Sequence, residues 1–166
     1  MARENWENKP AYTQALANKI RSSGFRPDVV VAIKSGGSAI GRMIAKDFGV
    51  PIQEITVQRR ASKLSLKDGM KPLIEAIKLF QVPKLTEGTI GSFSNKKVLI
   101  VDNSVTTGQT VEIARRHLME RGVTTGDIRT ASLYYLRGLK NRTPPDFYLG
   151  KRDSRLVRPK APKLQK

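Results

Sequence analysis

The chain has 166 residues with one His and no Cys, which excludes a disulfide framework, a thiolate zinc site and a cysteine nucleophile. Its 31 Lys and Arg against 14 Asp and Glu give a formal net charge of +17, and such a field attracts polyanions: nucleotides, nucleic acid or an acidic membrane surface. The length suits one α/β domain, no apolar run is long enough to span a membrane, and the polar start lacks signal-peptide character, so we expect a cytoplasmic protein.

The first third of the chain predicts a helix, a buried strand and a second helix. Apolar residues recur at helical spacing within 5–23, and Ser22-Ser23-Gly24 marks the end of that helix. The run 29–33 is β-branched and typical of a central parallel strand. The glycine loop Ser35-Gly36-Gly37 follows, and helical spacing returns over 40–48.

The region after the next strand has two interpretations. Residues 52–58 predict a third strand, which leads into the insertion 59–90 through Arg59 and Arg60. The Ser, Lys and Gly residues of the insertion suit a mobile cover, whereas the helical spacing over 73–80 suits an ordered helix that packs on a partner subunit. The sequence leaves both open.

The most informative stretch is 97–110. Val98-Leu99-Ile100-Val101 is typical of a fully buried parallel strand, which we expect to end at Asp102 and Asn103. A loop rich in Thr and Gly follows, and helical spacing resumes at Val111. At such a junction the backbone N–H groups of the loop and the first helical turn converge, and the helix dipole adds positive potential. The stretch therefore predicts a phosphate-binding loop with acidic groups beside it, and a parallel neighbour would bring the first glycine loop into the same crevice.

The sequence from Val101 to Thr110 resembles the phosphoribosyl pyrophosphate (PRPP) motif of type I phosphoribosyltransferases: a hydrophobic strand, two acidic residues and a Thr-Gly-x-Thr loop. The resemblance implies a parallel-sheet α/β fold with a small C-terminal hood. It also implies transfer of the phosphoribosyl group from PRPP to a nucleobase, with release of pyrophosphate. Asp102 and Asn103 would lie along the ribose as catalytic residues, with Asp102 also a ligand of Mg²⁺. The residues implied to bind pyrophosphate and the 5′-phosphate are Ser35, Gly36, Gly37, Ser104, Val105, Thr106, Thr107, Gly108, Gln109 and Thr110. For the adjacent Lys34 two alternatives are open: its side chain neutralises the pyrophosphate, or it points into solvent.

Four positions depart from the family pattern: Asn103 and Thr106 in the PRPP motif, and Leu136 and Arg155 in the C-terminal part. Asn103 replaces the second acid, so it offers a carbonyl acceptor without a charge to hold a magnesium-bound ribose. Thr106 stands where hypoxanthine-guanine relatives carry an acid that handles the proton of the base. We therefore expect a weakened enzyme.

The C-terminal part carries the expected base-binding residues. Residues 128–135 predict a further strand, and the segment 144–148 resembles the Pro-Asp-aromatic segment of xanthine-guanine and archaeal 6-oxopurine phosphoribosyltransferases, which implies a purine. The family's 6-oxo-reading lysine and its base-stacking aromatic residue correspond here to Leu136 and Arg155. The candidate base contacts are Arg137 or Lys140, Arg155, and the rings of Phe147 and Tyr148, with a core role equally open for Phe147.

The sequence leaves three hypotheses for the function open. The first is an active transferase built from a phosphoribosyltransferase-like domain over 1–150, which includes the insertion 59–90, followed by a basic hood extension or tail over 151–166. The second is a catalytically weak protein of this fold that binds PRPP, nucleotides or nucleic acid in a regulatory role. The third is a subunit of a larger assembly. We expect a homo-oligomer, a dimer or tetramer, and a surface or packing role for His117.

Overall fold

The computed structural model describes residues 9–34, 36–58, 84–87, 93–137 and 144–153. Most of the insertion after residue 58, residue Ser35 and the tail 154–166 lie outside the described residues. In chain order the elements are α1 (Lys9–Ser22), β1 (Val29–Ile33), α2 (Gly37–Phe48), β2 (Ile52–Gln58), β3 (Lys84–Glu87), β4 (Val98–Val105), α4 (Gln109–Glu120), the 3₁₀ turn η3 (Thr125–Asp127), β5 (Ile128–Arg137) and β6 (Phe147–Asp153).

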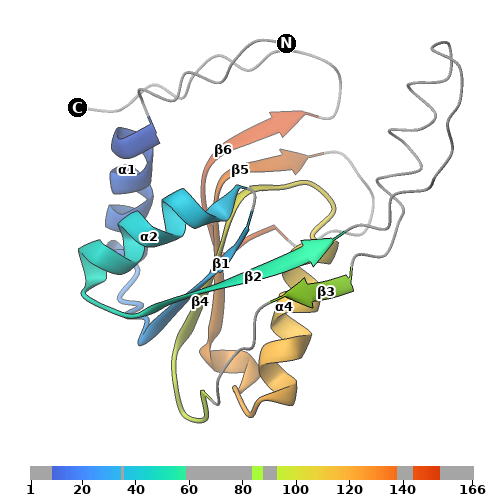
Figure 1. Ribbon diagram of the computed structural model, residues 1–166. Helices are drawn as coiled ribbons and strands as arrows, with labels where there is room; N and C mark the ends of the chain where they lie inside the picture. The colour runs from blue at the N-terminus through green and yellow to red at the C-terminus, as the bar shows by residue number, and fades with distance from the viewer. Residues whose placement is uncertain (1–8, 35, 59–83, 88–92, 138–143, 154–166) are drawn as a thin grey trace, which may run out of the picture.

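The strands form one sheet in the order β3-β2-β1-β4-β5-β6. The five strands β2, β1, β4, β5 and β6 are parallel to one another. The remaining strand, β3, lies at the edge and pairs antiparallel with β2. Helices α1 and α2 lie on one side of this sheet and α4 lies on the other (Figure 1). The predicted parallel α/β fold is therefore confirmed.

The two faces of the central strands build two separate cores. Val30, Leu99 and Val101 point to the side of α1 and α2, where they join Leu16 and Ile44. Alternate residues such as Val31 and Ile100 point to the other side and join Ala114 and Leu118 of α4. Because both faces are buried, β1 needs apolar residues at all five positions, which explains the unbroken Val-Val-Val-Ala-Ile run.

Two aspartates connect the amino ends of neighbouring strands through hydrogen bonds. Asp28 precedes β1, and its carboxylate accepts a hydrogen bond of 2.8 Å from the backbone N–H of Lys97, the residue before β4. Asp146 precedes β6, and its carboxylate accepts bonds of 2.7 Å from both the backbone N–H and the hydroxyl of Thr130 in β5. Each aspartate follows a proline, which favours an extended conformation in the residue before it. The Pro-Asp pairs therefore set where two strands begin.

The structure corrects the expected end of the central strand. The sequence predicts that the strand stops at Asp102, yet β4 continues to Val105 because β5 runs beside it and pairs Ser104 with Tyr134 and Val105 with Tyr135. The Asp-Asn pair thus belongs to the strand itself. The last described strand, β6, ends at Asp153, and the division between a domain over 1–150 and a hood extension or tail over 151–166 stays a prediction. None of the described helices combines the length and apolar character needed to cross a membrane.

Candidate functional site

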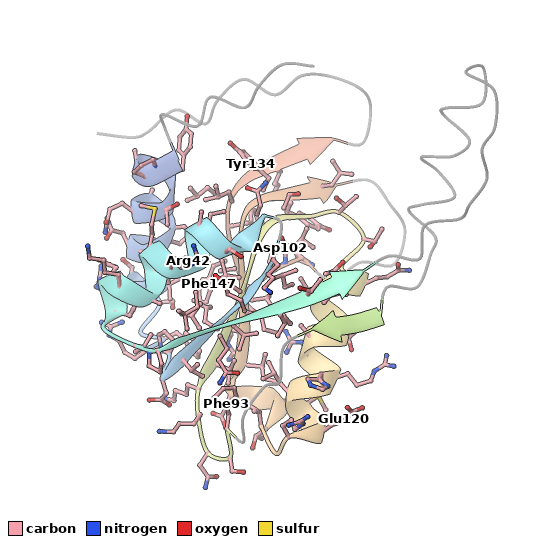
Figure 2. The ribbon with its side chains drawn as sticks, viewed as in Figure 1. Arg42, Phe93, Asp102, Glu120, Tyr134 and Phe147 are labelled. Carbon is pink, nitrogen blue, oxygen red and sulfur yellow. The ribbon has the colours of Figure 1, made fainter. Side chains whose placement is uncertain are left out.

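Two loops that are distant in sequence meet at the carboxyl edge of the sheet. β1 pairs directly with β4, with Ala32 opposite Val101, so the loop after β1 and the loop after β4 leave the sheet side by side. Each loop leads into a helix, α2 at Gly37 and α4 at Gln109. Figure 2 shows Asp102 near the start of α2, with Glu120 at the far end of α4. The expected shared crevice is therefore a geometric feature of the molecule.

The glycine loop touches β4 so closely that no side chain fits between them. A Cβ on Gly36 would lie 2.8 Å from the Cβ of Asn103. A Cβ on Gly37 would overlap the carbonyl oxygen of Val101 and lie 3.0 Å from the Cα of Asp102. Glycine at both positions brings the first loop against the Asp-Asn pair, which places the backbone of this loop beside the carboxylate of Asp102 in β4.

The second loop turns sharply into α4. Gly108 adopts the left-handed conformation, with φ of 75°, directly before the first residue of the helix. The buried hydroxyl of Thr107 accepts a hydrogen bond of 3.3 Å from the backbone N–H of Gln109. The backbone N–H of Glu112 donates to the carbonyl oxygen of Gly108 at 2.9 Å, which closes the first helical turn. The amino end of α4, with its positive partial charge, is thereby fixed beside the loop hydroxyls.

A cavity of about 410 Å³ lies between the two loops. Its wall combines the cation of Lys34, the carboxylate of Asp102 and the polar side chains that follow it, over an apolar floor from the ends of β1 and β2. The lining residues are Ile33, Lys34, Gly36, Val57, Asp102, Asn103, Ser104, Thr106 and Thr110. A smaller hollow of about 20 Å³ lies inside the second loop, lined by Asp102, Ser104, Val105, Thr106, Thr107, Gly108, Thr110 and Val111. A mixed wall of this kind suits a ligand with both hydroxyl and anionic groups.

The polar groups of the site are only partly satisfied within the protein. A carboxylate oxygen of Asp102 accepts a 2.7 Å hydrogen bond from the backbone N–H of Asn103. Among the described residues, the buried side-chain oxygens of Asn103 and Gln109 have no hydrogen-bond partner. No cluster of three or more His, Cys, Asp or Glu residues occurs in the described part of the chain. Any metal at this site would therefore draw most of its ligands from the substrate and water, as Mg²⁺ commonly does.

The structure leaves other predicted site residues away from this cavity. Phe147 is only 8% exposed, packs in the core beside α1 and α2, and lies 6.2 Å from the ring of Phe25. Tyr148 lies on the edge strand β6, where it pairs with Ser132 of β5, and its ring contacts that of Tyr135. Arg137 lies at the carboxyl end of β5, opposite Asp153. Ser35, Lys140 and Arg155 lie outside the described residues.

His117 lies on the last turns of α4, with its Nδ1 atom 3.6 Å from a carboxylate oxygen of Glu120. That end of the helix is remote from the loops (Figure 2). The surface or packing role expected for His117 stays a prediction.

Sequence reasoning missed two contributions. Ile33 and Val57 form the floor of the cavity, and their place at the carboxyl ends of two parallel strands is the signal that could have identified them. A further cavity of about 500 Å³ lies beyond the second loop, lined by residues of α4, β5 and the approach to β6. Gln109 and Arg115 contribute to its wall, and no local sequence pattern marks it.

Comparison with known proteins gives one family and many related folds. The family model described as "Phosphoribosyl transferase domain" matches residues 5–154. No curated protein sequence matches the chain.

Three solved structures illustrate the fold similarity. A purine phosphoribosyltransferase from Pyrococcus horikoshii superposes with a TM-score of 0.67 at 24% identity, over 90% of this chain and 85% of that one. A hypothetical protein from Neisseria gonorrhoeae with bound ppGpp has a TM-score of 0.66 at 20% identity, over 91% and 82%. A xanthine-guanine-hypoxanthine phosphoribosyltransferase from Helicobacter pylori has a TM-score of 0.62 at 16% identity, over 89% and 84%. At these identities the similarity shows the fold.

Proposed function

Since the chain belongs to the phosphoribosyl transferase domain family, we propose that it transfers the 5-phosphoribosyl group of PRPP to a nucleobase, with a purine as the expected acceptor. The observation that carries the proposal is the contact of the glycine loop with the Asp-Asn pair, which joins an anion-binding backbone to a carboxylate within one cavity. The purine assignment draws support from the structural relatives in Pyrococcus horikoshii and Helicobacter pylori.

The two loops divide the substrate between them in this proposal. The loop of Thr106 to Thr110, with the amino end of α4, binds the 5′-phosphate through backbone N–H groups and hydroxyls. Gly36 and Gly37 allow the pyrophosphate to approach the backbone of the first loop, and Lys34 at the cavity wall supplies a cation. The ribose lies between them, against Asp102 and Asn103.

In the proposed reaction Asp102 stabilises positive charge on the ribose and is also the candidate ligand of the metal ion. As the base nitrogen bonds to C1′ and the bond from C1′ to the pyrophosphate oxygen breaks, positive charge develops on the ribose, and the nearby carboxylate stabilises it. Asp102 is also the residue that would hold Mg²⁺, and the ion would supply charge neutralisation for the leaving pyrophosphate. Asn103 contributes hydrogen bonds without charge. The donor set fits magnesium because this cation is commonly bound through one or two carboxylates plus substrate oxygens.

The test is release of pyrophosphate from PRPP in the presence of Mg²⁺, across a panel of purine and pyrimidine bases. Asp102→Asn removes the charge and keeps the shape, so kcat/KM should fall by roughly two orders of magnitude. Asp127→Asn is the matched control, because it makes the same change in the turn η3 at the amino edge of the sheet. Release that is equal in Asp102→Asn and wild type would refute the assignment of Asp102.

Asn103 favours a second candidate, a protein that binds PRPP or a nucleotide without efficient turnover. The neutral side chain replaces a charge that the reaction uses, and the fold relative from Neisseria gonorrhoeae carries bound ppGpp. Asn103→Asp separates the two candidates. If the missing charge limits catalysis, this variant releases pyrophosphate faster than wild type; if PRPP binds in calorimetry and neither protein turns over with any base, the binding function is the better description. The homo-oligomer and the cytoplasmic location remain predictions, which size-exclusion chromatography and cell fractionation test.

A further inference from the structure

A group of aromatic and basic side chains lies on the opposite border of the molecule from β3. Lys19 of α1, Tyr135 of β5, and Tyr148 and Lys151 of β6 form it, and we call them the tyrosine–lysine cluster. The two lysines are exposed and the two tyrosines are half-buried. Figure 1 shows α1 next to β6, the last strand of the described sheet.

Tyr148 is the centre of the cluster, since the other three side chains each contact its ring. The rings of Tyr135 and Tyr148 lie 5.8 Å apart at an angle of 44°. The ammonium group of Lys19 lies 5.0 Å from the centre of the Tyr148 ring, and that of Lys151 lies 5.7 Å from it. Lys19 also donates a 2.8 Å hydrogen bond to the carbonyl oxygen of Tyr148, which fixes its side chain beside the ring.

These two cations differ from several others on the surface in having no acidic partner. Arg21 pairs with Asp47 at 2.6 Å, and Arg42 pairs with Glu54 at 2.7 Å. Lys19 and Lys151 form no ion pair with a carboxylate within the part of the chain that the structure describes. Among the described residues, no carboxylate neutralises the charge of either lysine.

The charge of the whole chain has the same sign. The formal net charge is +17, and residues 154–166, which follow β6 directly in the sequence, contain five Lys or Arg and no Asp or Glu. Phosphoribosyl transfer at the cavity uses only a few cations, since its substrate carries a small number of phosphate groups. Most of the excess charge has no role in that reaction.

We propose that the tyrosine–lysine cluster is a binding surface for single-stranded nucleic acid, with bases stacked on Tyr135 and Tyr148 and phosphates held by Lys19 and Lys151. Two adjacent aromatic rings, with two lysines that have no carboxylate partner among the described residues, match the alternation of bases and phosphates along a single strand. A duplex hides its base faces, so the cluster selects against it. This inference does not depend on the proposed transferase reaction, because none of the four residues lines the cavity between the loops.

The first test measures the binding of a fluorescein-labelled rU12 oligonucleotide, and of dT12 in parallel, by anisotropy at 50 and 200 mM salt. Lys19→Gln combined with Lys151→Gln should weaken binding at least tenfold at 50 mM salt and reduce the slope of log K against log salt by about 1.4, at about 0.7 for each lost phosphate contact. Lys46→Gln combined with Lys96→Gln is the matched control, because it removes the same net charge from exposed residues elsewhere. Equal losses in the two double variants, or no binding by wild type at 50 mM salt, would overturn the proposal.

The second test concerns stacking. Tyr148→Leu keeps an apolar side chain and removes the aromatic face, so affinity should fall about fivefold or more while the salt slope stays unchanged. Photocrosslinking with 4-thiouridine in the oligonucleotide should label peptides that contain Tyr135 or Tyr148. Labels confined to other peptides, or a 12-base-pair duplex bound as tightly as rU12, would contradict the assignment. Far-ultraviolet circular dichroism melts establish that each variant remains folded.

The third arm separates this surface from the cavity. Asp102→Asn should bind rU12 like wild type, and millimolar PRPP should not displace the oligonucleotide. Displacement by PRPP would place the nucleic acid in the cavity and overturn the proposal. Comparison of rU12 with dT12 identifies RNA or DNA as the preferred strand.

Discussion

The contact between the glycine loop and β4 makes Gly37→Ala the most direct test of how the site is built. Gly37 is buried and begins α2. The added methyl group would overlap the carbonyl oxygen of Val101 and crowd the Cα of Asp102. Both are backbone atoms of a strand that is paired on each side, so neither can rotate away as a flexible side chain would.

The expected change in the free energy of unfolding of Gly37→Ala is the sum of two effects of the methyl group. Overpacking of a well-packed site typically costs about 1–3 kcal/mol, and contact with backbone puts this substitution near the upper value. Alanine recovers up to about 1 kcal/mol because it restricts the unfolded chain and suits a helix better than glycine does. The net loss is about 2 kcal/mol, which corresponds to a decrease in Tm of about 4–8 °C in a protein of this size.

Thermal unfolding measured by circular dichroism, together with PRPP binding by calorimetry, provides the assay. Gly126→Ala is the control, because it adds the same methyl group in the turn η3, where no heavy atom lies within 4 Å of the new Cβ. We expect Gly126→Ala to melt close to wild type and Gly37→Ala to melt several degrees lower with weaker PRPP binding. Equal melting temperatures for the two variants would refute the close contact between the loop and β4.

Three further predictions concern the framework. Leu118→Ala removes a fully buried side chain between α4 and the sheet and should lower the free energy of unfolding by about 2–5 kcal/mol in urea titration. Asp146→Ala leaves the backbone N–H of Thr130 without its acceptor and should cost about 1–3 kcal/mol by the same measurement; an unchanged midpoint would contradict the fastening role of this aspartate. Arg42→Ala breaks an exposed ion pair with Glu54 and should change stability by less than about 1 kcal/mol, which a differential melt would detect as a shift of a few degrees at most.

The sequence predicts the central strands well because strands buried on both faces consist of consecutive apolar residues. The runs in β1 and β4 are apolar at every position since both faces of the sheet are covered, and the glycine loops after them predict the turns into α2 and α4. The extension of β4 to Val105 is not encoded locally. It depends on pairing with Tyr134 and Tyr135, about thirty residues later in the chain, which no local pattern reveals.

The base-binding residues illustrate a second limit. An aromatic residue after Pro-Asp can face a ligand or the core, and only the packing decides. Phe147 faces the core against Phe25, whereas Tyr148 joins the edge cluster with Lys19. Residue type alone therefore could not tell which of these two rings lies in the core and which lies at the edge. Their surroundings depend on the alternation of strand faces and on the position of α1.

The polar groups at the two edges of the sheet differ in how they are satisfied, and this difference supports the proposed place of the site. At the amino edge the carboxylates of Asp28 and Asp146 bond to backbone N–H groups of neighbouring strands, so their hydrogen-bonding capacity serves the fold. At the carboxyl edge the buried side-chain oxygens of Asn103 and Gln109 have no partner among the described residues. The buried Nε2 atom of His117 also lacks one there, but it belongs to the last turn of α4, away from the loops. An unpaired buried polar group costs roughly 1–3 kcal/mol, and a ligand or water that donates to it recovers that cost. The carboxyl edge therefore holds binding capacity that the fold itself does not use, and this is the edge at which both glycine loops open.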